Sequence, residues 1–244
     1  MWADLSLQTL AIVWLGGFLG GIATGAAGFA YGVVASSIWL HAIAPVHVTI
    51  LVVSIGLIIQ AGLTWKMRRS LDMQRLSPFV VAGLIGVPIG VWLVIKTDPS
   101  AIKVVLAAFM VAYGVYALAA PRLPRIIGGG KPADAAVGFV GGILGGLAGL
   151  SGILPAIWTQ IRGWPKDVAR GIFQPFIVAM HLATVVLIGV VALDRTGAVL
   201  FVAVFPAVLL GAWVGWSIYG KLDERSFQKM FAGLLVVSGV LLMT

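Results

Sequence analysis

The sequence predicts an all-α polytopic membrane protein made of two inverted-topology repeats, each a glycine-broken helical hairpin plus three transmembrane helices. Composition is the first reason. The chain of 244 residues is 61% hydrophobic and 10% charged, with a mean hydropathy of +1.10. A water-soluble domain of this length cannot bury that much apolar surface. The other reasons are a glycine-rich segment that occurs twice and an uneven distribution of positive charge.

Eight apolar segments divide the chain. Six have the roughly 20 residues that one membrane-crossing helix needs, and these are 46–65, 76–95, 101–120, 167–192, 197–217 and 226–243. The other two, 8–40 and 135–161, are longer and glycine-rich. Residues 24–28 interrupt the first, and residues 149–152 followed by Pro155 interrupt the second. We therefore expect each to form two short helices, arranged as a hairpin that enters and leaves the membrane on one side.

The two long segments are copies of one another. An offset of 121 residues (138 − 17) matches five glycines in order, Gly17, Gly20, Gly21, Gly25 and Gly28 with Gly138, Gly141, Gly142, Gly146 and Gly149. Glycines at this spacing leave one helix face bare, where a second backbone can approach closely. Paired, glycine-interrupted segments in the two halves of a transporter point to its binding site. We therefore divide one membrane domain into an N-terminal repeat (1–120), a cytoplasmic linker (121–134) and a C-terminal repeat (135–244).

Positive charge tests the hairpins, because cytoplasmic loops carry an excess of Lys and Arg. If both long segments cross only once, eight of the 16 basic residues lie on each side. If both are hairpins, all but Lys96, Lys103 and Arg195 share one side. That group of 13 (16 − 3) is Lys66, Arg68, Arg69, Arg75, Arg122, Arg125, Lys131, Arg162, Lys166, Arg170, Lys221, Arg225 and Lys229. The bias favours hairpins, termini outside the cytoplasm and halves that enter the membrane from opposite sides.

Several kinds of site are excluded. The chain has no cysteine, which removes disulfides, thiolate metal sites and cysteine nucleophiles. All eight carboxylates lie at or beyond segment ends, and there is no HExxH or Walker motif. We expect no enzyme activity, metal, cofactor or nucleic-acid partner. The net charge of +8 fits topology and anionic-lipid contact instead, and tryptophans near segment ends, such as Trp216, fit interfacial anchors.

Candidate substrate ligands lie in segment 167–192 and at the two breaks. Arg170, Gln174 and His181 share one helix face, at i, i+4 and i+11. Further candidates, on the corresponding face of segment 46–65 and around the breaks, are Ser54, Thr24, Gly25, Gly28, Tyr31, Ser151 and Gly152. Broken helices expose backbone N–H groups that can bind anions. A cation with no carboxylate beside it within the membrane favours a small anionic substrate. Purely structural alternatives are a snorkelling Arg170, an interhelical hydrogen bond for His181 and back-bonding for Ser54.

These features resemble the TauE/SafE family, described as sulfite and organosulfonate exporters. The matching motifs are GGFLGGIATGAAG (16–28), GGILGGLAGLSGILP (141–155) and the Pro-x-x-Val-x-Arg-Gly step at 165–171. The resemblance covers nearly the whole chain and implies transport of sulfur-containing or other small organic anions across the inner membrane. After the first break this chain has Phe29 and Tyr31 where the family pattern has a glycine cluster and a proline. An aromatic lining would suit a larger organic anion.

We therefore expect a secondary transporter that exports a small anion by alternating access. Export from a negatively charged cytoplasm is favourable by about 2.3 kcal/mol per charge per 100 mV, so it requires no coupling ion. Two alternatives stay open, a passive anion channel and a non-transporting membrane subunit. The expected partners are the anion and membrane lipids, and a homodimer is one assembly that the sequence allows.

Overall fold

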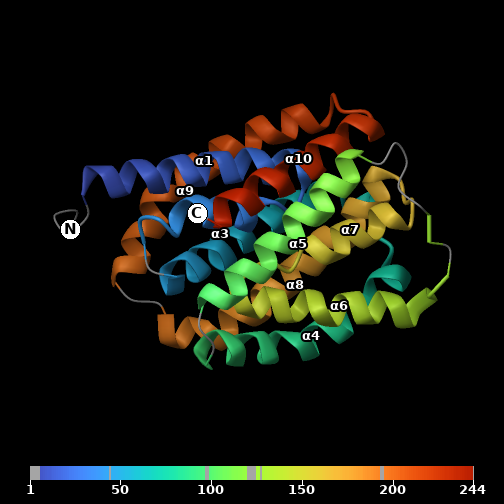
Figure 1. The fold of residues 1–244 in the computed structure, drawn as a ribbon, viewed down its shortest axis with the longest axis horizontal. Helices are drawn as coiled ribbons and strands as arrows, with labels where there is room; N and C mark the ends of the chain where they lie inside the picture. The colour runs from blue at the N-terminus through green and yellow to red at the C-terminus, as the bar shows by residue number, and fades with distance from the viewer. Residues whose placement is uncertain are drawn as a thin grey trace.

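The computed structural model describes residues 6–43, 45–96, 99–119, 125–126, 128–192 and 195–243. Every regular element within these ranges is a helix (Figure 1), so the all-α prediction is confirmed. The elements are α1 (Leu7–Ala27), α2 (Tyr31–Trp39), α3 (Pro45–Lys66), the 3-10 helix η1 (Arg68–Ser70), α4 (Met73–Lys96), α5 (Pro99–Ala119), α6 (Gly130–Ala148), α7 (Ile153–Ile161), α8 (Lys166–Ala192), α9 (Arg195–Tyr219) and α10 (Glu224–Met243).

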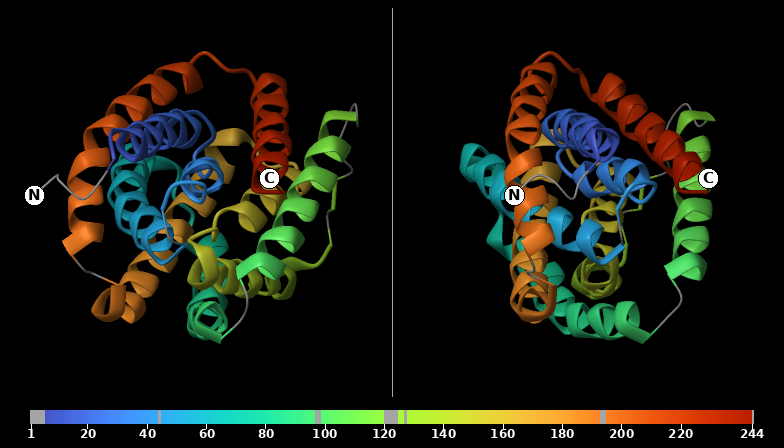
Figure 2. Two further views of the ribbon diagram at one scale, coloured as in Figure 1. Left: turned by 60° about the vertical axis from the view of Figure 1, so that its left-hand side comes forward. Right: turned by 90° about the vertical axis from the view of Figure 1, so that its left-hand side faces the viewer.

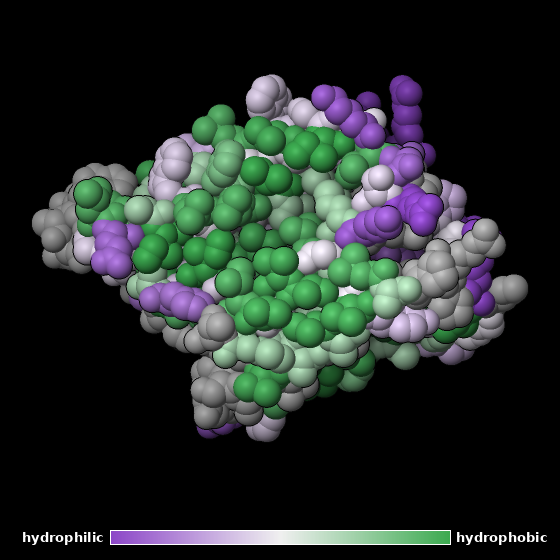
Figure 3. All heavy atoms as spheres, turned by 45° about the horizontal axis from the view of Figure 1, so that its top comes forward, coloured by the Kyte–Doolittle hydropathy of each residue, from purple (hydrophilic) through white to green (hydrophobic). Residues whose placement is uncertain are grey.

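Helices α3, α4, α5, α8, α9 and α10 match the six predicted crossing segments to within three residues at each end. Within the described ranges, five helices are long and apolar enough to cross a membrane, namely α1, α3, α4, α8 and α9. Large apolar side chains point outward along α4, where Val81, Ile85 and Trp92 are 60–63% exposed. Figure 3 shows hydrophobic residues covering the middle of one face. Such a surface needs a lipid environment, so this is a multi-pass membrane protein.

The two glycine-rich segments form hairpins, as expected. The short helix α2 runs back along α1, because a Cβ at Gly20 would lie 3.1 Å from the Tyr31 ring and Trp39 Nε1 donates to the Val13 carbonyl at 2.9 Å. The expectation of two short helices is wrong for the first member of this hairpin. Helix α1 has 21 residues, which at about 1.5 Å per residue suffices to cross the membrane alone.

Each break begins at a glycine in the left-handed conformation, which is unfavourable for residues that have a side chain. Gly28 (φ +93°) ends α1 and Gly149 (φ +70°) ends α6. The second break covers residues 149–152 as predicted, but Pro155 lies in the first turn of α7, where a missing N–H is tolerated. Thr24 and Gly25 were expected in the first break and are still helical, because close packing of α1 supports its glycines. Similarly, residues 130–134 of the expected linker belong to α6.

The bare glycine faces allow two close helix pairs, α1 with α9 and α6 with α4. A Cβ at Gly21 would lie 2.5 Å from the Val208 carbonyl oxygen, and one at Gly142 would lie 2.1 Å from the Gly83 carbonyl oxygen. Neither position has room for a larger residue. Helices α5 and α10 form another neighbouring pair on one side of the bundle (Figure 2).

In each hairpin, a tryptophan of the short helix bonds to the beginning of the long helix, although the offset of 121 residues relates only the two acceptor residues. In the first hairpin, the Trp39 indole bonds to Val13, and in the second, Trp158 Nε1 donates to Asp134 Oδ1 at 2.7 Å. The offset of 121 residues relates Val13 to Asp134 (13 + 121), and each bond fastens a short helix to the beginning of a long one. Helices α1 and α6 begin toward opposite ends of the bundle (Figure 1). These directions are those of an inverted repeat, although the twofold inversion and the domain division stay predictions.

Basic side chains from several helix ends meet at one end of the molecule. Lys66 Nζ lies 4.8 Å from the centre of the Trp216 ring, while Arg75 and Arg162 lie 5.0 and 5.6 Å from that of Trp164. These contacts connect the end of α3, the beginning of α4, the α7–α8 junction and the end of α9. We call this the basic end. In Figure 3, hydrophilic side chains gather mainly on the right. That the basic end faces the cytoplasm stays a prediction.

Side chains cap the exposed N-terminal ends of three helices, α1, α4 and α10. Ser6 Oγ accepts from the Thr9 N–H at 3.0 Å, and Asp72 Oδ1 accepts from the Gln74 N–H at 3.1 Å. Asp223 Oδ1 accepts from the Ser226 N–H at 2.7 Å before α10. The hydroxyl and backbone N–H of Ser226 hold the pKa of the Asp223 carboxyl below its usual value, because both donate to the ionised form. Such caps fix where each helix starts.

Candidate functional site

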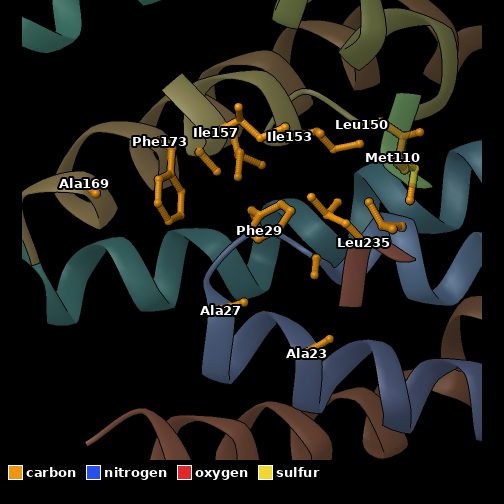
Figure 4. Packing of buried hydrophobic residues seen from close by; sticks show 14 residues of the cluster. Ala23, Ala27, Phe29, Met110, Leu150, Ile153, Ile157, Ala169, Phe173 and Leu235 are labelled. Carbon is orange, nitrogen blue, oxygen red and sulfur yellow. The ribbon is translucent and has the colours of Figure 1, made fainter. Parts of the chain in front are cut away.

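The two helix breaks meet in the interior of the bundle. A Cβ at Gly32 would lie 3.3 Å from the Gly149 carbonyl oxygen, and one at Gly152 would lie 2.9 Å from Phe29 Cβ. The predicted meeting of the breaks is therefore present. Apolar side chains fill the space around the contact (Figure 4), among them Phe29, Leu150, Ile153, Ile157 and Phe173. The breaks are closed against one another in this conformation.

Three polar side chains surround the end of α1 at the first break. Gln60 Nε2, from α3, donates to the Gly28 carbonyl at 2.7 Å and lies 3.1 Å from Thr24 Oγ1. From the other side, Arg170 Nε and the end of the Gln174 amide on α8 lie 2.9 and 3.1 Å from where a Gly28 Cβ would be. Helices α3 and α8 therefore bring Thr24, Gly28, Arg170 and Gln174 together, as predicted for a common site.

Arg170 is fully buried and caps the C-terminus of α1. Its Nη1 donates to the carbonyls of Gly25 and Ala26 at 3.3 and 3.5 Å, and its Nη2 donates to Gly25 at 3.3 Å. These carbonyls belong to the last turn of α1, which has no intrahelical donors for them and carries partial negative charge. With its oxygen turned toward the guanidinium, the Gln174 amide accepts from Nη2 at 2.8 Å. Arg170 thus does not snorkel outward.

Two aromatic rings from the end of α9 hold the guanidinium in place. The Arg170 Cζ atom lies 4.0 Å from the centre of the Tyr219 ring and 5.2 Å from that of the Trp216 ring. The Tyr219 hydroxyl donates to Asp167, in the first turn of α8. Stacking on aromatic faces stabilises a partly desolvated cation. The first break is therefore lined by α1 carbonyl oxygens and a cation, whereas the sequence suggested exposed N–H groups as the main anion ligands.

The second break has a different polar contact. His181 Nε2 lies 3.1 Å from the Gly149 carbonyl oxygen. Because a carbonyl only accepts, Nε2 carries the proton and Nδ1 of the neutral ring is an acceptor. A Cβ at Gly56 would lie 2.7 Å from His181 Cε1 and 3.6 Å from the Tyr31 ring, so Tyr31 joins this group. Within the described part of the chain, His181 Nδ1, Tyr31 Oη and Ser151 Oγ are buried without hydrogen-bond partners.

Gln60 and His181 are equivalent residues of the two halves, since 60 + 121 = 181. Each binds the carbonyl of the left-handed glycine that ends the first helix of its own hairpin. The contacts from the opposite half differ. Gly28 meets Arg170 and Gln174, whereas a Cβ at Gly149 would lie 2.7 Å from Val52 and 3.1 Å from Val53. Position 53 corresponds to Gln174 (53 + 121), and Thr49 corresponds to Arg170 (49 + 121). The first break is therefore polar and charged, and the second is largely apolar.

Three of the predicted site residues have other surroundings. The bare face of Gly25 packs on α9, where a Cβ would lie 2.4 Å from the Ala212 carbonyl oxygen, so it offers Arg170 only its carbonyl. Gly152 contacts Phe29 and Ile177. Ser54 lines a separate hollow of about 270 Å³ between α3 and the beginning of α9. The structure does not bring Ser54 to the breaks.

Three residues outside the predicted set, Gln60, Trp216 and Tyr219, belong to the surroundings of the site. Gln60, on α3, makes an interhelical hydrogen bond to the Gly28 carbonyl at the end of α1. Trp216, expected at the lipid interface, packs on Arg170 together with Tyr219. Their spacing of three residues at the end of α9 puts both rings on one helix face, a signal that could have been used.

The chain matches one known protein family over nearly its whole length. The family described as sulfite exporter TauE/SafE matches residues 13–242. The chain belongs to the TauE/SafE family. The match includes both glycine breaks, α8 and the end of α9, and membership implies a membrane exporter of sulfite or a related sulfur compound. A search of curated proteins found no match for this TauE/SafE protein, and neither did a search of solved structures.

Proposed function

We propose that this TauE/SafE protein is a secondary transporter that exports a small sulfur-containing or organic anion across the inner membrane by alternating access. The observation that carries the proposal is the contact between two helix breaks in the interior, with Arg170 buried beside the first. Broken helices that meet near the middle of a membrane bundle are the usual place for a transported substrate.

The charges around the first break support an anion as the substrate. A buried cation is costly in a membrane interior, and it is kept where it serves a pathway or a partner. The contacts of Arg170 with the first break are neutral carbonyl oxygens and an amide, while Asp167, one turn earlier on α8, contributes an opposite charge. An oxyanion would form stronger, charge-assisted hydrogen bonds with the guanidinium than these neutral groups do. The hydroxyls of Tyr31 and Ser151, which lack partners among the described residues, would supply donors at the second break.

Closure of the two breaks supports a carrier in preference to a pore. Phe29, Leu150 and Phe173 are at least 94% buried in the cluster between the breaks. An anion could pass only if the breaks separate. Alternating access requires that the two breaks separate toward either side of the membrane in turn.

Flux measurements in proteoliposomes test this function. Sulfite, small alkyl sulfonates and carboxylates are compared under an imposed membrane potential. We expect saturable flux of at least one sulfur oxyanion, accelerated by a potential that drives anions outward. Counterflow separates the mechanisms, because unlabelled anion on the far side accelerates a carrier and leaves a channel unchanged. Absence of flux for every anion contradicts the proposal.

A further inference from the structure

We propose that Arg170 is an anion-released latch on the first break. The transported anion replaces the last-turn carbonyls of α1 as the hydrogen-bond acceptor of the guanidinium. The end of α1, no longer bonded to Arg170, then moves so that the first break opens toward the basic end. This inference rests on the proposed function, because its ligand is the transported anion. It goes further by assigning the substrate the task of opening one particular break.

The contacts of Arg170 with α1 are of a kind that an anion can replace. All three are to neutral carbonyl oxygens, at 3.3 to 3.5 Å. Hydrogen bonds from a guanidinium to an ionised oxyanion are shorter and about twice as strong, and they can be bidentate. Meanwhile Tyr219 and Trp216 hold the guanidinium against α9 by its faces. The N–H groups can therefore change partners while the side chain stays where it is.

A row of cations leads from the surface at the basic end to Arg170. Lys66 is exposed and lies over the Trp216 ring, and Lys166 Nζ lies 5.0 Å from the centre of the Tyr219 ring. The two rings thus alternate with three cations, in the order Lys66, Trp216, Arg170, Tyr219, Lys166. The Asp167 carboxylate, which accepts from the Tyr219 hydroxyl, is an acidic group beside these three cations. A local excess of positive charge raises the local concentration of anions and speeds their association. An anion arriving from this end would meet Arg170 before it reaches the contact between the breaks.

The second break lacks such a latch. Thr49 and Val53 occupy the positions that correspond to Arg170 and Gln174, and Val52 and Val53 contact Gly149. No cation is bonded to the end of α6 at these positions, so an anion has no such bond to replace there. Its binding therefore favours opening of the first break alone. A ligand shifts a conformational equilibrium only through contacts that differ between the states. This asymmetry of otherwise equivalent positions assigns the first opening to the basic end.

Two equivalent reporter positions can test the latch. The natural chain has no cysteine, so a single introduced cysteine reports without interference. Ala27→Cys and Ala148→Cys (27 + 121 = 148) each place a thiol directly before a left-handed glycine. Reaction with a membrane-impermeant maleimide is measured from the basic end in oriented vesicles. Methanesulfonate, which does not react with maleimides, is compared with chloride at equal ionic strength.

We expect methanesulfonate to accelerate labelling at position 27 about fivefold or more, within the usual range of coupling between sites, and to leave position 148 unchanged. Arg170→Gln should make position 27 reactive without anion and abolish the anion effect. If Arg170→Gln does not fold, Gln174→Met provides a second variant. It keeps the charge, removes one acceptor, and should raise labelling at position 27 before anion is added.

The same vesicles distinguish failure of the latch from failure of the proposed function. Methanesulfonate flux with anion-independent labelling at position 27 overturns the latch and leaves the transporter standing. Equal acceleration at positions 27 and 148 overturns it as well, because both breaks would then respond. Absence of flux for methanesulfonate, sulfite and carboxylates overturns the function itself.

Discussion

At the scale of single residues, two buried glutamines show why burial alone does not reveal a role. Gln60 and Gln160 are 1% and 7% exposed. Gln60 Nε2 donates to Gly28 and Thr24, whereas neither atom of the Gln160 amide has a partner among the described residues. A buried polar group that bonds to an otherwise unsatisfied carbonyl stabilises the fold, and one without a partner costs desolvation energy.

Replacing each glutamine by methionine, which has a similar shape, should separate these cases. Gln60→Met leaves the Gly28 carbonyl without its donor and should lower the free energy of unfolding by about 1 to 3 kcal/mol. Gln160→Met removes an unsatisfied amide and should leave stability unchanged or raise it by about 1 kcal/mol. Thermal unfolding in detergent, followed by tryptophan fluorescence, is the measurement. Equal losses for the two variants would show that the Gln60 bond is not what holds the break.

At the scale of elements, the glycine faces decide which helices become neighbours. Helix α6 reaches α4 only because Gly142 and Gly146 have no side chains, with would-be Cβ atoms 2.1 and 2.3 Å from the carbonyl oxygens of Gly83 and Val87. Backbones so close exchange many dispersion contacts, the main attraction between helices in lipid. Packing of the same kind, of α1 on α9, keeps Gly25 helical where the sequence suggested a break.

Gly142→Ala should therefore be destabilising, although alanine favours helices. The added methyl group meets backbone and must push α6 away from α4, at a cost of about 1 to 3 kcal/mol. Gly62→Ala, on the outside of α3 where nothing lies within 4 Å of the added atom, is the matched control. It should be neutral or stabilising by up to about 1 kcal/mol. The two are compared by thermal unfolding in the same detergent, and similar stability of both variants would contradict tight α4–α6 packing.

At the scale of the whole molecule, the hairpins determine where the loops and termini lie. Both hairpins return toward the side where they begin, so the first turn of α1 and the last turn of α10 lie toward the same end (Figure 1). The contacts of Lys66, Arg75 and Arg162 gather the charge at the other end. By the positive-inside rule, we expect that basic end to face the cytoplasm.

Reporter fusions in bacteria test this orientation. Alkaline phosphatase, which is active only outside the cytoplasm, should be active when fused after Met243. It should be inactive when inserted at Gly128, which has open space around it, because this loop is expected on the cytoplasmic side. A fluorescent protein that folds only in the cytoplasm should give the reverse pattern. Activity of phosphatase at Gly128 would mean that the chain is inserted in the opposite sense.

The sequence predicted the helices better than the contacts of the site. Crossing segments were found to within three residues, because membrane thickness fixes helix length and apolar residues mark it. The second break was located from glycines and a proline. The first was placed four residues too early, because packing of α1 on α9 outweighs weak helix propensity at Thr24 and Gly25. Arg170 and Gln174 were placed together by helical spacing, but the cap on α1 joins residues 145 apart (Arg170 to Gly25) and leaves no local signal.

The sequence by itself determined that this is a membrane protein of the TauE/SafE family with two glycine-broken hairpins, because composition, period and charge bias are properties of the chain alone. Only the tertiary structure decided that the two breaks are unequal. Arg170 caps the first and valines contact the second, and that difference depends on which side chain of α3 or α8 lies opposite each glycine. The spacing of residues in a helix predicts which side chains share a face. Which neighbouring residues that face contacts depends on how whole helices pack against one another.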